Sequence, residues 1–304
     1  MSNVEDLYKL PHDVQELNRL DVQHRMWLLM VGGLYPSELS SVVERLMTSG
    51  TPRIMDVGCG SGIWAVEMAK QFPQAEVIGI DITPLKLYRP IPPNFIFRQQ
   101  NLAGGLPIEY TNQFDIIHCR CVCQHVPDPQ RLIDDIVRCL KPGGLALIPD
   151  GEWVAFDEDR KPLEPFVYNP SLSIEENIMN TRKLSAYGGW LNAFGRATLS
   201  PTYQFPNLLL ENNGGVRNIM FREHWAPTGW AGKGIPHGEE IGAIMYLNLK
   251  EFLQTASSAI TNQGVPIAVV DALRERATEE LNERRHNVWY YTSAVALDAP
   301  HPKL

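Results

Sequence analysis

The stretch PRIMDVGCGSG, residues 52–62, constrains the fold of this chain more than any other. Ile54, Met55 and Val57 form a short apolar run of the kind that makes a buried parallel strand. The following segment, IWAVEMAKQF (63–72), has apolar residues at helical spacing. Between the two lie three glycines, Gly58, Gly60 and Gly62. A strand, a glycine turn and a helix in this order let a ligand approach the backbone closely and leave N–H groups free at the start of the helix.

A glycine turn alone does not identify the ligand, because nicotinamide and flavin enzymes have a similar turn. Two carboxylates narrow the choice. Asp56 leads into the turn, where it would repel a pyrophosphate. The second expected strand, AEVIGIDIT (75–83), ends in Asp81, and a carboxylate about 20 residues beyond such a turn accepts hydrogen bonds from ribose hydroxyls. The pair indicates an adenosine ligand that carries positive charge and no phosphate, which describes S-adenosylmethionine.

The following segments continue the alternation of strands and helices. We expect strands at NFIFRQQNL (94–102), FDIIHCR (114–120) and GLALIPDGEW (144–153), and an amphipathic helix at DPQRLIDDIVRCLKPGG (128–144). The end of the first of these strands places Asn101 and Leu102 near an adenine. Five strands alternating with helices predict a parallel, doubly wound α/β sheet.

Taken together, these motifs resemble the class I S-adenosylmethionine-dependent methyltransferases. The matching stretches are MDVGCGSG, GIDIT, FDIIHCR, HVPDP and LKPGG, in the usual order and at the usual spacing. The resemblance implies a Rossmann-like seven-stranded α/β sheet, with N-terminal helices and a helical insertion after the fifth strand. An antiparallel hairpin completes such a sheet, and we expect its strands at 216–227 and 288–297. The implied cofactor is S-adenosyl-L-methionine, without a metal.

Both ends of the chain are similar to the fungal LaeA-like (UMTA-type) methyltransferases of secondary metabolism. The likeness includes a tyrosine–leucine–proline stretch at 8–11 and RLDVQH at 19–24. It also includes GSGIW, which ends in Trp64, and the pattern around EIGAIMYLNLKEFLQTAS (240–257). The chain departs from this group at Asn101, where many members have an aspartate. The resemblance therefore covers nearly the whole chain but leaves the substrate open.

The resemblance implies one methyltransferase domain with four segments. These are an N-terminal helical lid (1–50), the cofactor-binding Rossmann-like core (51–155), a helical substrate-cover insertion (156–215), and C-terminal strands and helices (216–304). With 44% hydrophobic and 20% charged residues, the composition is that of an ordinary globular protein. The oligomeric state is not readable.

Charge and cysteine content limit the partners and the compartment. The net charge of −8 argues against non-specific binding to nucleic acid or to an anionic membrane. No apolar run is long enough for a membrane helix, and the N-terminus lacks a signal peptide. The 5 cysteines are an odd number, as expected for reduced thiols in the cytoplasm. A nuclear location is the alternative for a regulatory protein.

The stretch CRCVCQHVPDP, residues 119–129, has the ligand types of a zinc site but not the spacing. Structural zinc sites usually take their ligands as two separated pairs. If the strand continued, the alternate side chains would point in parallel; if the chain turns after Arg120, as the family fold implies, they diverge. We therefore expect no metal here, and apolar packing for most of the thiols.

His125 is the candidate catalytic residue in that stretch. Many members of the family have a histidine in this loop, which lies under the transferred methyl group. An imidazole has the pKa range to deprotonate a hydroxyl or a ring N–H at neutral pH. The alternative is that His125 braces the following helix through its ring nitrogens.

The expected cofactor contacts begin with Gly58, Gly60 and Asp81. Asp56 either orients backbone N–H groups or binds the amino group of the cofactor, and Cys59 contributes only its backbone. The resemblance adds Gly62, Ile82, Asn101, Leu102 and Cys119. Three N-terminal residues, Tyr8, Arg19 and Gln23, close over the cofactor, with Arg19 pairing with its carboxylate. The alternative for them is a packing helix with a solvated face.

For the substrate, Glu152 and Trp153 end the fifth strand at the active-site edge. Aromatic residues between 166 and 205 either line an apolar acceptor pocket or form the core of a helical insertion. The expected contacts among them are Tyr187, Trp190 and Phe194.

The implied reaction is methyl transfer to a small, rather apolar natural product, with O- or N-methylation favoured. Two alternatives stay open. One is a non-catalytic or regulatory S-adenosylmethionine-binding protein of the LaeA type that acts through protein partners. The other is an enzyme of this fold with a changed reaction, such as a cyclisation.

Overall fold

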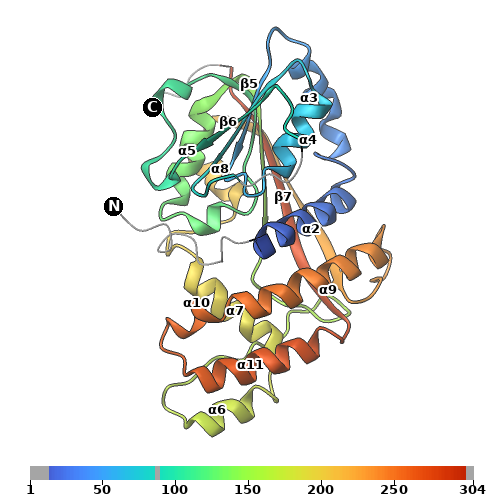
Figure 1. Cartoon of the computed structure of the whole chain (residues 1–304), viewed down its shortest axis with the longest axis vertical. Helices are drawn as coiled ribbons and strands as arrows, with labels where there is room; N and C mark the ends of the chain where they lie inside the picture. The colour runs from blue at the N-terminus through green and yellow to red at the C-terminus, as the bar shows by residue number, and fades with distance from the viewer. Residues whose placement is uncertain (1–13, 86–89, 299–304) are drawn as a thin grey trace.

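The computed structural model describes residues 14–85 and 90–298, with side chains from Arg19 onward. Tyr8 lies outside the described residues. Figure 1 shows an upper part built on a β-sheet and a lower part made mainly of helices. Within the described ranges, no helix is both long and apolar enough to cross a membrane.

The upper part is a seven-stranded sheet with the order β3-β2-β1-β4-β5-β7-β6. Its strands are β1 (Arg53–Val57), β2 (Glu76–Asp81), β3 (Phe95–Gln99), β4 (Phe114–His118), β5 (Leu140–Gly151), β6 (Val216–Thr228) and β7 (Arg285–Ala296). The pairs among β1 to β5 are parallel, whereas β7 is antiparallel to both β5 and β6. The predicted Rossmann-like fold and its antiparallel hairpin are therefore confirmed.

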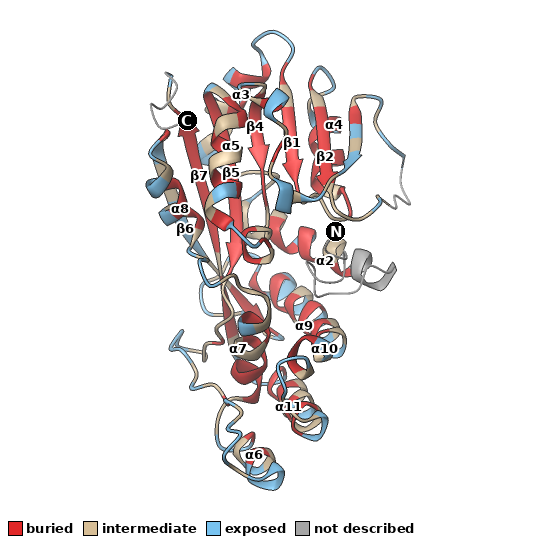
Figure 2. Ribbon diagram, turned by 90° about the vertical axis from the view of Figure 1, so that its left-hand side faces the viewer, coloured by how far each residue is buried: buried red, intermediate tan, exposed pale blue. Residues whose placement is uncertain are grey.

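Helices cover both faces of the sheet. One face is covered by α2 (Val14–Val31), α3 (Ser40–Met47) and α4 (Ile63–Gln71), and the other by α5 (Pro129–Cys139) and α8 (Pro206–Asn213). Strands β1, β4 and β5 are buried almost throughout, as Figure 2 shows, because parallel strands between two helix layers have no solvated face. The edge strand β6 is largely exposed along its first half.

The helix expected at 128–144 ends earlier, at Cys139. Leu140 is already extended and pairs with Phe114, so the lysine–proline–glycine stretch belongs to β5. Gly143 adopts a left-handed φ of 72°, and the register between β4 and β5 shifts between Phe114 and Ile116. The turn signal in the sequence therefore marks an irregularity in the strand and not the end of the helix.

The lower part combines segments that are far apart in the sequence. It contains α6 (Ile174–Asn180), α7 (Ala186–Thr198), α9 (Gly238–Thr255), α10 (Ser257–Thr261) and α11 (Ile267–Glu280). The expected cover, 156–215, is thus divided: α6 and α7 join the lower helices, whereas α8 packs against α5 and β6 of the upper part. The other lower helices, α9, α10 and α11, come from the segment between β6 and β7. Helix α2 lies between the two parts, against α9 (Figure 1).

A buried carboxylate joins two of these lower helices. Glu280, at the end of α11, accepts hydrogen bonds from the backbone N–H of Ala186 (2.7 Å) and the hydroxyl of Ser185 (2.8 Å). Both donors are at the start of α7, where backbone N–H groups lack partners inside the helix and a negative charge is favourable. This contact fixes α7 relative to α11.

The short connections contain four 3₁₀ turns in the described residues. They are η1 (Ser37–Leu39), η2 (Leu102–Gly104), η3 (Ile108–Tyr110) and η4 (Cys123–His125). Two of them, η2 and η4, follow β3 and β4 at the carboxyl edge of the sheet and contribute residues to the cavity described next.

Candidate active site

A cavity of about 430 Å³ opens at the carboxyl edge of the parallel strands. Its first part, the glycine half, is formed by the β1–α4 turn and the ends of β2 and β3, and includes Asp56, Gly58, Cys59, Gly60, Asp81, Ile82, Asn101 and Leu102. Its second part, the aromatic half, is formed by the end of β5 with α7, α9 and β7, and includes Glu152, Trp153, Leu191, Leu249, Phe252 and Trp289. Because β4 lies between β1 and β5 in the sheet, residues that follow β4 sit between the two halves.

Asp81 has the geometry of a diol acceptor. One carboxylate oxygen accepts the backbone N–H of Gly60 (2.8 Å), and the other accepts the backbone N–H (2.9 Å) and hydroxyl (2.8 Å) of Thr83. These bonds fix the carboxylate at the end of β2, where it lines the cavity. A carboxylate offers about four acceptor positions, and three are used here, so the oxygen that accepts Gly60 can take a further hydrogen bond from a ligand hydroxyl. This acceptor fits a ribose hydroxyl of an adenosine.

The glycines of the turn are required by contacts within the protein. Gly58 has φ +67°, and an added Cβ would lie 2.4 Å from Cγ2 of Val122. Gly60 has φ +55°, with its added Cβ 3.0 Å from Cδ1 of Leu20. Gly62 does not line the cavity; it caps the start of α4 at φ 72°. The expectation for Gly62 is therefore corrected to a role in starting the helix.

Asp56 is buried at the end of β1 and bonded to a histidine. Its Oδ1 lies 2.7 Å from Nδ1 of His118, whose ring stacks on Trp64 with centroids 3.8 Å apart. Burial lowers the pKa of His118, although the carboxylate opposes this effect. The contact with His118 fixes the carboxylate of Asp56 at the wall of the cavity.

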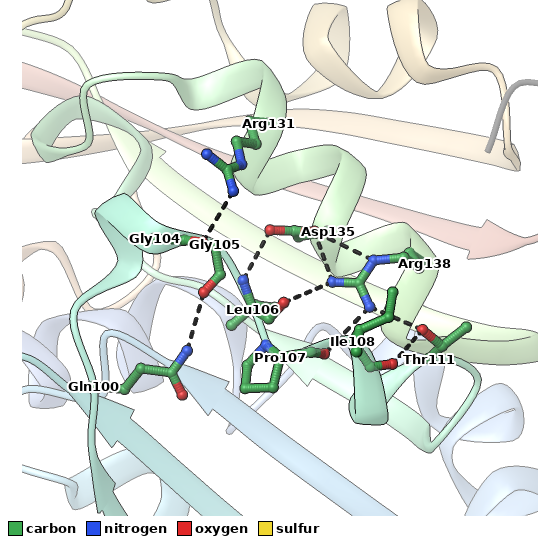
Figure 3. Close-up of polar contacts among 10 residues, drawn as sticks. All are labelled: Gln100, Gly104, Gly105, Leu106, Pro107, Ile108, Thr111, Arg131, Asp135 and Arg138. Atoms are coloured by element: carbon green, nitrogen blue, oxygen red, sulfur yellow. Dashed lines mark hydrogen bonds and ion pairs between the residues drawn. The ribbon is translucent and has the colours of Figure 1, made fainter.

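The loop after β3 is tied to α5 by charged groups (Figure 3). Asp135 accepts the backbone N–H of Leu106 (2.8 Å) and bonds Arg138 (2.7 Å), whose guanidinium also donates to the carbonyl oxygen of Leu106 (2.8 Å). Asn101 accepts the backbone N–H of Ala103 (2.9 Å) and so begins η2. These bonds hold the loop that carries Asn101 and Leu102 at the cavity.

Helix α2 contributes a cation to the cavity. Arg19 is 6% exposed, and its NH1 donates to Oδ1 of Asn248 in α9 (3.0 Å). Gln23 is one turn further along the helix and also lines the cavity. The structure thus directs these two side chains into the cavity and not toward solvent.

The three cysteines after β4 diverge, because the chain turns at Cys121. This residue adopts a left-handed φ of 55°. Cys119 and Cys123 are fully buried in the apolar cluster beneath α5, whereas Cys121 packs on the cluster at the other face. Cys119 does not line the cavity, which corrects its expected cofactor contact. No group of histidine, cysteine and carboxylate side chains suited to a metal is found in residues 14–85 and 90–298.

His125 is the last residue of η4 and lines the cavity near the carboxyl end of β4. Burial, with a contribution from the nearby charge of Arg19, lowers the pKa of His125 to about 4. The imidazole is therefore neutral at pH 7. It is able to accept a proton but holds it only weakly.

The aromatic half differs from the expected set. Tyr187, Trp190 and Phe194 are fully buried and do not line the cavity, which corrects all three predicted contacts. They fill the core behind the wall: Phe194 packs against Trp153 with ring centroids 4.9 Å apart. From α7 only Leu191 reaches the cavity. An amphipathic pattern shows that a helix is buried but not which buried side faces a cavity.

Glu152 and Trp153 do line the cavity, as expected. Glu152 accepts a hydrogen bond from the hydroxyl of Tyr290 (2.7 Å), and Trp153 stacks on Phe252 with centroids 5.6 Å apart. The wall is therefore mainly apolar, with a carboxylate at its rim.

A stripe on α9 and a cation after β4 also line the cavity, and neither was expected from the sequence. The stripe consists of Met245, Asn248, Leu249 and Phe252. Its spacing of three and four residues was a readable signal for a buried helix face, but not for a cavity wall. The missed cation is Arg120, which lines the cavity between the two halves.

Comparison with known proteins gives the family. A model of the methyltransferase domain family matches residues 33–200. The secondary metabolism regulator laeA of Coprinopsis cinerea is 26% identical over 288 residues, which cover 91% of this chain and 66% of that protein. Methyltransferase str2 of Strobilurus tenacellus is 36% identical over 148 residues, or 48% of this chain and 50% of that protein.

A third relative carries a different name. The protein-methionine methyltransferase laeA of Emericella nidulans is 31% identical over 147 residues, which cover 45% of this chain and 34% of that protein. The matches thus span between 34% and 66% of the lengths of these three relatives. Since the family model matches more than half of the 304 residues, the chain belongs to the methyltransferase domain family.

Proposed function

We propose that this chain transfers a methyl group from S-adenosylmethionine to a small, rather apolar acceptor, with O- or N-methylation favoured. The observation that carries the proposal is one continuous cavity. It joins a glycine half, whose Asp81 suits an adenosine, to an aromatic half whose mainly apolar wall suits an organic acceptor. The two ligands would meet at the end of β4.

In this proposal the glycine half holds the cofactor. Asp81 accepts the ribose hydroxyls, and the backbone of Gly58, Cys59 and Gly60 follows the methionine part. The side chains of Ile82 and Leu102 flank the adenine, with the amide of Asn101 at its edge.

Charged groups of the cavity hold the two ends of the methionine part. Asp56, held in place by His118, binds the amino group, and Arg19 binds the carboxylate. Both side chains are held by partners in the protein, so they are already oriented before the cofactor binds.

When bound, S-adenosylmethionine supplies an electrophilic methyl group. The protein contributes mainly by positioning: Trp153, Leu249 and Phe252 exclude water and hold the acceptor atom in line with that group. His125 faces the same space and accepts the acceptor's proton only where the acceptor is itself acidic, since its pKa is about 4.

Incubation with methyl-labelled S-adenosylmethionine and a fractionated fungal small-molecule extract tests the proposal. We expect a labelled small product that is lost in Asp81→Asn. Label that appears on protein alone, or nowhere although the cofactor binds, contradicts a small-molecule acceptor.

A second candidate is methylation of protein, in a regulatory role. The names of the relatives from Coprinopsis cinerea and Emericella nidulans favour it. The same labelling experiment with a protein extract discriminates, because a protein acceptor gives a labelled band. A cytoplasmic location accompanies the first proposal and a nuclear one the second.

A further inference from the structure

Arg120 is the second residue after the end of β4, and its backbone is fixed by the neighbouring strand. The N–H groups of Cys119 and Cys121 donate to the carbonyl oxygens of Leu147 and Pro149 in β5, both at 2.9 Å. Arg120 therefore projects from a rigid position at the junction of the glycine and aromatic halves, and it lines the cavity there.

One nitrogen of this guanidinium is anchored by a pair made of the buried His24 and the partly exposed Glu67. NH1 of Arg120 lies 3.2 Å from Nδ1 of His24, and Nε2 of His24 lies 3.0 Å from a carboxylate oxygen of Glu67. A guanidinium only donates, so Nδ1 accepts and the proton of His24 is on Nε2, where it donates to Glu67. Burial lowers the pKa of His24, which keeps the ring neutral. His24, held by Glu67, therefore orients Arg120 without adding a second positive charge.

The rest of the guanidinium lacks an anion. Among the residues that the structure describes, no carboxylate forms an ion pair with Arg120 and no other hydrogen bond to it is found. The nearby carboxylates are engaged, Asp56 by His118 and Glu67 by His24. A half-buried cation is favoured by an ionic partner, so the edge of Arg120 that faces the cavity favours a negatively charged ligand.

The cavity has a second cation, Arg19, which comes from α2 and lies elsewhere in the cavity than Arg120. The two residues after it contact the glycine turn: Leu20 lies against Gly60, and Asp21 accepts the hydroxyl hydrogen of Ser61 (2.7 Å). These contacts hold the backbone of α2 at the glycine half, and the guanidinium of Arg19 reaches from there to Asn248 of α9. The proposed function pairs Arg19 with the carboxylate of the cofactor. That assignment leaves Arg120 for the other ligand.

We propose that Arg120 binds an acidic oxygen of the methyl acceptor, so that the acceptor is an apolar ring compound carrying a carboxylate. This rests on the proposed function. The aromatic half supplies the apolar wall for the ring, and the guanidinium supplies two parallel N–H donors, the geometry that matches a carboxylate.

Calorimetry with matched probes tests the inference. The protein is first saturated with S-adenosylhomocysteine and then titrated with 2-naphthoate or with 2-naphthamide, which has the same shape and no charge. We expect the carboxylate to bind at least about tenfold more tightly than the amide. Arg120→Met removes this preference, and Arg120→Lys, which keeps the charge without the planar fork, retains part of it.

Binding of S-adenosylhomocysteine separates the possible failures, and it also reports that each variant is folded. Equal or absent binding of the two probes by the saturated protein overturns the inference and leaves the proposed function intact. A loss of S-adenosylhomocysteine affinity in Arg120→Met by about tenfold or more, with affinity retained in Arg19→Met, assigns Arg120 to the carboxylate of the cofactor and also overturns it. Failure of the unaltered protein to bind S-adenosylhomocysteine removes the proposed function and the inference together.

Discussion

The two halves of the cavity are built in different ways. The glycine half comes from consecutive elements, with its main residues between Asp56 and Ala103. The aromatic half takes its residues from four distant segments between Glu152 and Trp289. In the glycine half, backbone geometry and carboxylates make the site, whereas in the aromatic half side-chain surface does. A cofactor-type site can therefore be local in sequence, whereas an acceptor-type site depends on tertiary packing.

The largest expected effect is in the glycine half, from Gly58→Ala. The new Cβ would lie 2.4 Å from Val122 at φ +67°, so the turn must move away from its ligand. We expect affinity for S-adenosylhomocysteine to fall by at least about 100-fold, measured by calorimetry.

Gly234→Ala is the matched control. Gly234 has the same φ of +67°, but nothing lies within 4 Å of an added Cβ. It carries the left-handed backbone cost, about 1–2 kcal/mol, without the clash. We expect a lower unfolding temperature and unchanged cofactor affinity. Equal affinities in the two variants would show that the contact with Val122 is unimportant.

The next largest effect is expected from Asp81→Asn, which is compared with the same type of change in the aromatic half. An amide keeps the shape of the carboxylate but loses the charge and one acceptor oxygen, so bonds to the N–H of Gly60 and to a ribose compete. We expect about 10- to 100-fold weaker binding of S-adenosylhomocysteine, or roughly 1.4–2.8 kcal/mol. Glu152→Gln, the same change at the aromatic half, is expected to leave that affinity within about twofold. The comparison fails if both changes weaken cofactor binding alike.

A smaller effect is expected in the aromatic half from Phe252→Leu. The ring of Phe252 lines the cavity, so its loss is expected to raise the KM for the acceptor by about three- to tenfold, with KM for the cofactor unchanged. Phe194→Leu is the control, because Phe194 touches Phe252 (4.8 Å between centroids) but lies behind the wall. Both variants should lose similar stability in denaturant unfolding. A raised KM in Phe194→Leu as well would mean that the wall acts as one packed unit.

The smallest effect on turnover is expected from His125→Gln, and it shows instead in the pH dependence of stability. The folded pKa of His125 is about 4, below the unfolded value of about 6.5. Between these values the unfolded chain binds more protons, so this residue makes stability fall as pH drops from about 6.5 to about 4, by as much as about 3 kcal/mol. The slope of unfolding free energy against pH is proportional to the difference in bound protons between the unfolded and folded states. His125→Gln is expected to reduce this slope between the two pKa values, by an amount that corresponds to at most one proton. Turnover at pH 7 is expected to stay within about threefold; a loss above 100-fold would make His125 an essential base.

The residues that could be read from the sequence are those whose role is set by local backbone chemistry. Gly58, Gly60 and Asp81 fall within one strand–turn–helix–strand unit, and the structure places them as a local motif predicts. The parallel arrangement of the first five strands follows from the alternation of strands and helices.

The residues of the aromatic half could not be predicted in the same way, because they depend on which side of a buried helix faces the cavity. The aromatic residues of α7 fill the core, and a stripe on α9, from Met245 to Phe252, forms the wall instead. Both helices have apolar residues at the same spacing, so periodicity does not distinguish them. Arg120 was not singled out because its anchor, His24, is 96 residues away in the sequence.

Calorimetry of the unaltered protein decides whether the glycine half holds S-adenosylmethionine. Titration with S-adenosylhomocysteine is expected to show saturable binding with one site per chain, and titration with NAD, which carries a pyrophosphate, is expected to show none because Asp56 repels it. No saturable binding of S-adenosylhomocysteine at about 1 mM, or tighter binding of NAD, would contradict the account.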